Sequence, residues 1–291
     1  MNIGEIGNKS KKLLINYSVI VPYRDKYDLF LKAINSIPDR DDIQIIIVDN
    51  APQPLSASQV PHKLNAKVVY STSSPTKGAG CARNEGLKHV EGEFLLFLDA
   101  DDFFTDEAFA AFDRYLNEEY DIVFFNPTSV RLSDGGKSDR HLQCSNSIDQ
   151  YLKNGNDGLL RYRWEVPWSK LFRTEFVKKE RVQFDEIKVN NDAWFSIMTG
   201  HAAKKVHADS SVVYVVTEGE SGSSLTKKRT KENWFIRYQV AIRINKFLKS
   251  EGKYQYRIRL LGFLKVVLKE FGIIEFCYFF KYAIKNKVGI F

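Results

Sequence analysis

Five short apolar runs alternate with helical patterns over residues 17–126 of the chain. Each run is rich in Val, Ile, Leu or Phe, which is typical of strands buried on both faces of a parallel sheet. Between the first two runs, Phe30, Ala33 and Ile37 recur at helical spacing. Strands alternating with helices indicate βαβ units, so we predict an α/β fold whose mostly parallel sheet is flanked by helices. The predicted strands are residues 17–21, 43–48, 67–70, 94–98 and 121–125.

The fourth predicted strand ends abruptly in a cluster of carboxylates. The apolar run from Phe94 to Leu98 is followed by Asp99-Ala100-Asp101-Asp102. Three carboxylates this close repel one another unless a cation or a donor group compensates them. Mg²⁺ takes oxygen ligands and often combines one or two carboxylates with substrate phosphates, so the cluster indicates a divalent metal site. The structural alternative is that Asp101 or Asp102 caps a helix beginning near Thr105.

Polar residues also follow the other predicted strands. Right-handed crossovers between parallel strands place these loops at one edge of the sheet, where ligands of open α/β sheets bind. The first strand is followed by Pro22-Tyr23-Arg24-Asp25, the second by Asp49, and the third by a helix start that carries Arg83. We therefore expect a site for a nucleotide and a metal at this edge.

These loops belong to a longer series of short motifs. The series begins with Val21-Pro22-Tyr23, Val48-Asp49, Gly80-x-Ala82-Arg83-Asn84-x-Gly86 and Phe97-Leu98-Asp99-Ala100-Asp101-Asp102. It continues with Pro167-Trp168-x-Lys170-Leu171-Phe172, Asn190-Asn191-Asp192-x-x-Phe195, and Tyr214 followed by Ser221-Gly-Ser-Ser224. In this order the motifs resemble the family 2 glycosyltransferases of the GT-A fold, of the type that builds bacterial capsules, exopolysaccharides and lipopolysaccharides.

The resemblance covers residues 17–225 and suggests how the chain is divided. It implies a GT-A domain over 17–225, with a nucleotide-binding part at 17–126 and an acceptor and catalytic part at 127–225. Residues 1–16 are expected to be a leader, and residues 226–291 a basic, aromatic, helical tail. No stretch approaches the roughly 18 uncharged residues of a transmembrane helix. Cys81, Cys144 and Cys277 lie far apart, which indicates reduced thiols and a cytoplasmic location.

The resemblance also implies which residues bind the nucleotide-sugar donor. Pro22 and Tyr23 would wall the base, Asp49 would accept a hydrogen bond from it, and the base is usually uracil. Arg83 would lie near the diphosphate at a helix start, where free N–H groups favour anions. The implied donor-binding residues are Pro22, Tyr23, Arg24, Asp25, Asp49, Arg83, Asp99 and Ala100.

Metal binding and catalysis are implied for the remaining motif residues. Asp101, with Asp99, would hold Mn²⁺ or Mg²⁺ as a DXD motif, and Asp192 would be the general base. His201 or His207 could add a third metal ligand, or could be ordinary exposed histidines. Trp168 could pack in the core or against a sugar, and Lys170 could pair with a phosphate or with a carboxylate. Asp192 could alternatively cap the helix that follows it.

The expected reaction is therefore inverting, metal-dependent transfer of a sugar from a nucleotide-sugar, usually a UDP-sugar. The acceptor would be a hydroxyl group of a surface polysaccharide or a lipid-linked oligosaccharide. Arg24 and Asp25 resemble the version of the first motif found in β-1,4-galactosyltransferases, but the block that those enzymes carry later is absent, so the sugar stays open. A nucleotidyltransferase-like enzyme is the alternative, although the loop at Pro22–Asp25 lacks the glycines that such an enzyme would need.

The positive charge of the chain is concentrated in the tail. Residues 226–291 hold 16 Lys and Arg against 4 Asp and Glu, whereas residues 1–225 carry a net charge of −5. Basic helices rich in aromatic residues favour a membrane interface with anionic lipids, so peripheral contact with the inner face of the cytoplasmic membrane is one interpretation. In the other, the aromatic residues pack on the catalytic domain. A non-catalytic membrane or nucleic-acid adaptor would leave the motifs of the body unexplained, and no nucleic acid partner is expected.

Overall fold

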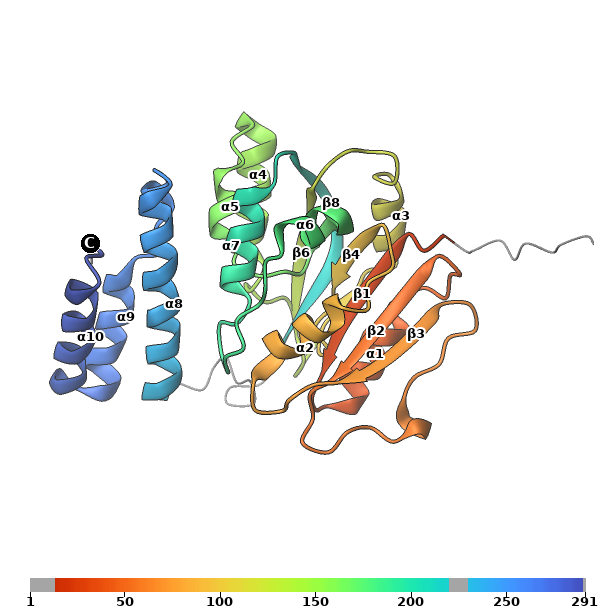
Figure 1. The fold of residues 1–291 in the computed structure, drawn as a ribbon, viewed down its shortest axis with the longest axis horizontal. Coiled ribbons are helices and arrows are strands. Elements are labelled where there is room, and N and C mark those ends of the chain that lie inside the picture. Colours follow the sequence, from red (N-terminus) through yellow and green to blue (C-terminus); the bar gives the residue numbers. More distant parts are fainter. Residues whose placement is uncertain (1–13, 220–229, 290–291) are drawn as a thin grey trace, which may run out of the picture.

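A computed structural model of the chain describes residues 14–219 and 230–289. Most of the predicted leader lies outside these ranges. The same is true of the Ser221–Ser224 motif and of the first residues of the predicted tail. The described residues form a mixed α/β domain and, beside it, a unit of three helices (Figure 1).

Within the described residues, one eight-stranded sheet has the order β3-β2-β1-β4-β7-β6-β8-β5. The first four strands in this order pair in parallel, as predicted. Every residue of β2 and β4 is buried, as expected for strands inside a parallel sheet, whereas β3 lies at the edge of the sheet and is only partly buried. Their bounds are Tyr17–Tyr23 for β1, Ile43–Asp49 for β2, Lys67–Thr72 for β3 and Phe94–Phe97 for β4.

The second half of the sheet is mixed, which the local pattern of the sequence does not reveal. Strand β7 (Lys170–Arg173) lies between β4 and β6 and is antiparallel to both. The fifth predicted strand is longer than expected, because β6 runs from Ile122 to Arg131. Strand β8 (Val206–Glu218) pairs in parallel with β6, and the short β5 (Phe103–Phe104) pairs antiparallel with β8.

One hydrophobic core runs through both halves of the domain. Phe97 on β4 contacts the rings of Phe172 and Phe195 edge-on, at centroid distances of 5.8 and 5.6 Å, so the parallel strands pack directly on the later segments. The helices of the domain are α1 (Tyr27–Asn35), α2 (Gly78–Leu87), α3 (Ala108–Asp113), α4 (Leu142–Asn154), α5 (Gly158–Arg163), α6 (Thr174–Glu180) and α7 (Ala193–Ala202).

Three helices follow the domain: α8 (Lys231–Ser250), α9 (Leu260–Phe271) and α10 (Ile273–Lys285). They share a core of their own that includes Tyr238, Leu264 and Phe279. Through Val240, Ile244 and Leu248, α8 also packs on α7 and α5. In the described part of the chain, no helix combines the length and the apolarity needed to cross a membrane.

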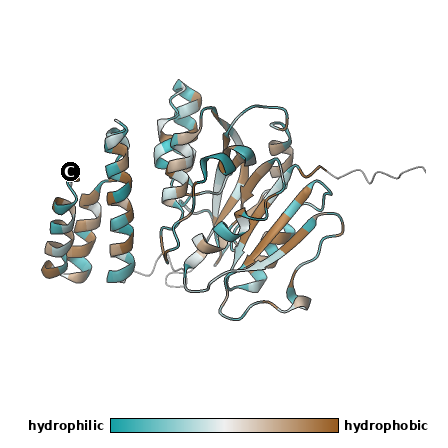
Figure 2. Ribbon diagram, viewed as in Figure 1, coloured by the Kyte–Doolittle hydropathy of each residue, from teal (hydrophilic) through white to brown (hydrophobic). Residues whose placement is uncertain are grey.

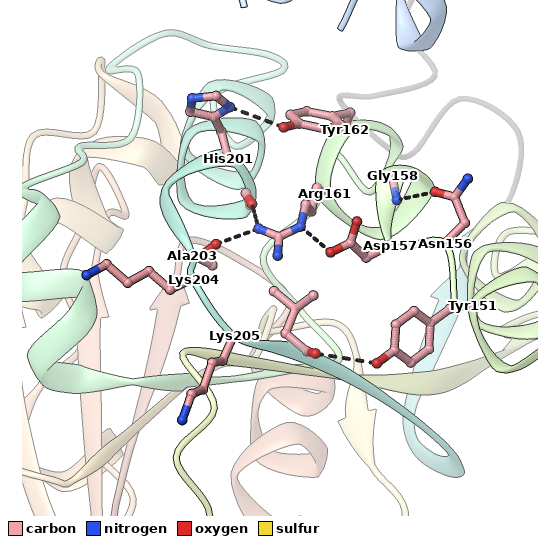
Figure 3. A network of polar contacts seen from close by, with 12 residues as sticks. Tyr151, Asn156, Asp157, Gly158, Arg161, Tyr162, His201, Ala203, Lys204 and Lys205 are labelled. Carbon is pink, nitrogen blue, oxygen red and sulfur yellow. Dashed lines mark hydrogen bonds and ion pairs between the residues drawn. The ribbon is translucent and has the colours of Figure 1, made fainter. Parts of the chain in front are cut away.

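The C-terminal end of α7 is held by a network around Arg161 of α5 (Figure 3). The Nη1 group of Arg161 donates to the carbonyl oxygens of Gly200 and Ala203 at 2.8 and 2.6 Å, and Nε donates to the Asp157 carboxylate at 2.6 Å. The last carbonyl groups of a helix lack partners within the helix, and a cation is favourable there. Because α7 begins at the opposite end, beside Asp192, this network fixes the helix that presents Asp192.

We expect the substitution Arg161→Ala to lower the free energy of unfolding by about 2 kcal/mol, because it leaves two carbonyl groups and a carboxylate without their donor. Urea titration would measure the change. Lys205→Ala is the matched control, because Lys205 forms an exposed ion pair with Glu119 at 2.8 Å. This substitution should lower the free energy of unfolding by less than about 1 kcal/mol. Equal effects of the two substitutions would contradict the role given to Arg161.

Candidate active site

The loops that follow the parallel strands meet at one edge of the sheet, as predicted. In register, Tyr23 at the end of β1 lies opposite Asp49 at the end of β2, which lies opposite Thr72 at the end of β3. Helix α2, which carries Arg83, starts soon after β3 at the same edge.

Arg83 joins the loop after β4 to the segment before α7. Its guanidinium group is buried. The Nη2 group donates to Asp99 Oδ1 at 2.6 Å, and Nη1 donates to Asn191 Oδ1 at 2.9 Å. A buried charge needs a partner of opposite sign, which Asp99 provides. The motifs around residues 83, 99 and 191 are therefore one structural unit, although more than 100 residues separate the first from the last.

Asp192 directly follows the Asn191 partner of Arg83 and occupies the N-cap position of α7. Its side chain makes no capping hydrogen bond, so the interpretation of Asp192 as a helix cap is wrong. Burial raises the pKa of the Asp192 carboxyl group above its ordinary value, and Asp99 raises it further, whereas Arg83 and then Arg237 lower it. The charge of Asp192 in turn raises the pKa values of Glu165 and Lys170, so both groups lie within electrostatic reach of it. Asp192 thus lies in a low-dielectric site with charges of both signs around it.

The three carboxylates after β4 have different surroundings. Asp99 binds Arg83, whereas the side chain of Asp101 is 48% exposed and lies 4.0 Å from Lys26 Nζ. Asp102 is buried, and its carboxylate accepts hydrogen bonds from the Tyr214 hydroxyl group at 2.9 Å and from the Thr217 N–H at 2.7 Å. The N-cap of α3 is Glu107, so neither Asp101 nor Asp102 caps that helix.

Tyr214 of β8 connects this carboxylate loop to Trp168. Its hydroxyl group donates to Asp102 and accepts from the Asp99 N–H at 3.1 Å, and its ring stacks on the indole of Trp168 at 5.2 Å and 10°. Trp168 is buried, so of its two suggested roles the core-packing one describes its contacts here. The hydrogen bonds of the Tyr214 hydroxyl group were not predicted from the sequence, although the motif that contains this tyrosine was noted.

Lys170 bonds to a backbone carbonyl oxygen rather than to a carboxylate. Its ammonium group is fully buried in β7, and Nζ donates to the Trp164 carbonyl oxygen at 3.2 Å among the rings of Phe124 and Phe172. Burial lowers the pKa of Lys170 to about 7. This bond to the backbone supports the segment before Trp168, and the pairing of Lys170 with a phosphate stays a prediction.

Asp49 is buried at the end of β2 and already has several partners. It accepts hydrogen bonds from the N–H groups of Ala51 and Leu55 at 2.8 and 2.7 Å and from the Tyr70 hydroxyl group at 2.8 Å. A carboxylate offers about four acceptor positions, so about one is left for a ligand. Tyr23 is also buried, with its ring 4.6 Å from that of Phe30.

Arg24 connects three of the loops at this edge. Its Nη1 group donates to the Pro75 carbonyl oxygen at 2.8 Å and to Asn50 Oδ1 at 3.3 Å. Pro22 and Ala100 are partly buried, and Asp25 is exposed. Arg24 therefore holds the loops after β1, β2 and β3 together.

The carboxylates fit the expected metal in number and type. Asp101 is open and Asp99 is partly exposed, and Mn²⁺ or Mg²⁺ often uses one or two carboxylates beside substrate phosphates. Among the residues described, no three His, Cys, Asp or Glu side chains form a group that could hold a metal by themselves. Neither histidine completes one: His201 Nδ1 lies 3.2 Å from the Tyr162 hydroxyl group, and His207 stacks on Tyr120.

Comparison with known proteins gives matches along most of the chain. The model of the family described as glycosyl transferase family 2 matches residues 18–180. The poly(ribitol-phosphate) beta-N-acetylglucosaminyltransferase TarS of Staphylococcus aureus is 25% identical over 72% of this chain and 37% of its own length. The poly(ribitol-phosphate) beta-glucosyltransferase of Bacillus spizizenii is 24% identical over 68% of this chain and 32% of its own length. The chain thus spans about a third of the length of these curated relatives.

Solved structures share the fold. The structure of residues 1–349 of S. aureus TarS with UDP-GlcNAc has a TM-score of 0.68 at 21% identity, and the match covers 93% of this chain and 81% of that chain. A mannosyltransferase from Pyrobaculum calidifontis with GDP-mannose and Mn²⁺ has a TM-score of 0.55 at 13% identity, over 95% of this chain and 81% of that chain. The predicted GT-A type of fold is confirmed by the first of these likenesses.

We expect Tyr214→Phe to lower the free energy of unfolding by about 1–2 kcal/mol, because the buried Asp102 carboxylate loses a donor and the Asp99 N–H loses its acceptor. Thermal and urea unfolding would measure this change. The control is Tyr278→Phe, which removes the same hydroxyl group from an exposed tyrosine of α10. If Tyr214→Phe were as neutral as this control, Asp102 would not depend on Tyr214.

Proposed function

The chain belongs to glycosyltransferase family 2, and on this basis we propose that it transfers a sugar from a UDP-sugar to a hydroxyl group by an inverting, metal-dependent reaction. The acceptor would be a cell-surface polysaccharide, a teichoic-acid-type polymer or a lipid-linked oligosaccharide. One observation carries the proposal: Arg83 joins the donor-side Asp99 to the segment that presents Asp192. This link supports a single centre in which the donor and the acceptor meet.

The UDP-sugar is supported by two lines of argument. The similar structure of TarS contains UDP-GlcNAc, and Asp49 and Tyr23 lie at the end of the site where a base would bind. In the proposal, Pro22 and Tyr23 wall the base and the remaining acceptor position of Asp49 receives a hydrogen bond from it. Arg24, Asp25 and Ala100 complete the donor site.

The acceptor class is supported by the relatives. The two curated relatives named above act on poly(ribitol-phosphate), which offers free hydroxyl groups along a polymer. We include contact of the tail, residues 226–291, with the inner face of the cytoplasmic membrane in the proposal, because acceptors of this kind can be membrane-bound. Nucleotidyl transfer and a non-catalytic adaptor role are less well supported, since family membership and the site both favour sugar transfer.

In the proposed reaction, Asp192 takes the proton of the acceptor hydroxyl group as its oxygen attacks the anomeric carbon of the sugar. The bond from the oxygen to the anomeric carbon forms while the bond to the diphosphate breaks, and the electron pair leaves with the nucleoside diphosphate. One base on the face opposite the leaving group gives inversion, by the logic that applies to inverting glycosidases. A metal at Asp101 and Asp99 would offset the negative charge on the diphosphate.

The first experiment is a thermal-shift panel of UDP-, GDP-, CMP- and dTDP-sugars with and without Mn²⁺. We expect stabilisation by a UDP-sugar that increases when Mn²⁺ is present, because binding only to the folded state stabilises it. Asp101→Asn should remove the part of the shift that depends on Mn²⁺, whereas Asp106→Asn, an exposed control on the same stretch, should keep it. Stabilisation by UDP-sugars that Mn²⁺ leaves unchanged would exclude the metal site at Asp101.

Asp192→Asn should reduce transfer by at least about 100-fold, because an amide cannot take the proton, while UDP-sugar binding stays as in the natural chain. Since burial raises the pKa of Asp192 and only the ionised carboxylate accepts a proton, the rate should fall as the pH drops through that raised pKa. Steady-state kinetics across pH and calorimetric binding of the donor would measure both effects. A variant that transfers sugar at the natural rate would exclude Asp192 as the base.

A further inference from the structure

The hairpin of α9 and α10 exposes apolar side chains where the two helices meet. Leu268, Ile273 and Ile274 are 45%, 61% and 79% exposed. Gly272 joins the helices with a φ of +87°, and nothing lies within 4 Å of the position that a Cβ atom would take there. Figure 2 shows this end of the unit as strongly hydrophobic. We call these four residues the hairpin tip.

The hairpin tip lies on the side of the molecule that carries the candidate active site (Figure 1). Glu275 in the first turn of α10 forms an ion pair with Lys231, the first residue of α8. The next residue of α8, Glu232, pairs with Lys188 at 3.5 Å. Lys188 follows Ile187, whose carbonyl oxygen accepts a hydrogen bond from Asn191, the partner of Arg83. A chain of contacts thus connects the start of α10 to the carboxyl edge of the sheet.

The unit around the hairpin tip is strongly basic. Residues 230–289 hold 13 Lys and Arg against 4 Asp and Glu. Two of these acids, Glu232 and Glu275, already pair with lysines. On α10, the exposed Lys281 and Lys285 alternate with exposed Tyr278 and Ile284. An anionic lipid surface complements this charge, whereas a second copy of the same unit would repel it.

We propose that the hairpin tip inserts into the interfacial layer of a bilayer that contains anionic lipids, with Lys281 and Lys285 near the headgroups. Exposed isoleucine and leucine side chains lose contact with water on insertion, and lysines further along α10 attract anionic headgroups. The docking turns the carboxyl edge of the sheet toward the membrane. The inference rests on the proposed function, in which the acceptor is bound to a membrane.

The test is flotation of the full chain with vesicles of phosphatidylcholine alone or mixed with phosphatidylglycerol. We expect the natural chain to float with the mixed vesicles, and the double variant Ile273→Glu, Ile274→Glu to lose at least about tenfold in partitioning. Leu64→Glu is the matched control, because Leu64 is an exposed leucine on the catalytic domain (90%) and its loss should not change flotation. Failure of the natural chain to float, or equal flotation of the double variant, would overturn the proposal.

Three further measurements separate the alternatives. Lys281→Gln with Lys285→Gln should weaken binding to the mixed vesicles, while binding to phosphatidylcholine alone stays weak. If sedimentation instead shows a dimer that the Ile273→Glu, Ile274→Glu variant abolishes, the hairpin tip contacts a second copy and the proposal is wrong. The UDP-sugar thermal shift of the double variant should equal that of the natural chain. Flotation without any such shift in the natural chain would retain the docking surface and reject the proposed reaction.

Discussion

The arrangement of the site depends on one buried guanidinium group. Arg83 comes from α2, yet its hydrogen bonds end on the loop after β4 and on the segment before α7. A charge in this position is tolerable only while both partners stay in place, since an unpaired buried charge is very costly. The same contact therefore stabilises the fold and fixes the separation between the carboxylates that would hold the metal and the carboxylate that would take the proton.

The three carboxylates after β4 would repel one another, but each has different surroundings. Asp99 faces Arg83, Asp102 is turned inward to Tyr214 and Thr217, and Asp101 is the most exposed of the three, with 48% of its side chain accessible. Strand β8 thereby holds the loop after β4 through Tyr214 and Thr217. The stacking of Tyr214 on Trp168 connects the loop to the segment that precedes β7. The loop can hold Asp101 beside Asp99 because burial raises the pKa of Asp102 well above its ordinary value and so favours the uncharged form of this third carboxyl group.

The apolar runs of the sequence predicted the parallel strands, because each of these strands is marked by its own residues. The strands at 17–21, 43–48, 67–70 and 94–98 and the meeting of their loops at one edge follow from apolar runs and from the handedness of crossovers. The insertion of β7 between β4 and β6 could not be predicted, because it depends on pairing between distant segments. The partner of Lys170 was missed for a related reason: a lysine that bonds a backbone carbonyl leaves no mark in the residue pattern.

The two faces of α8 have a consequence for how the protein could evolve. One face of α8 packs on Ala193 and Ile197 of α7. Arg237, which also belongs to α8, lowers the pKa of Asp192. The other face carries the hairpin of α9 and α10. Loss of α8 would uncover the catalytic domain, whereas the hairpin can diverge without disturbing the chemistry. The hairpin can therefore accept substitutions that α8, which packs on both the domain and the hairpin, cannot accept.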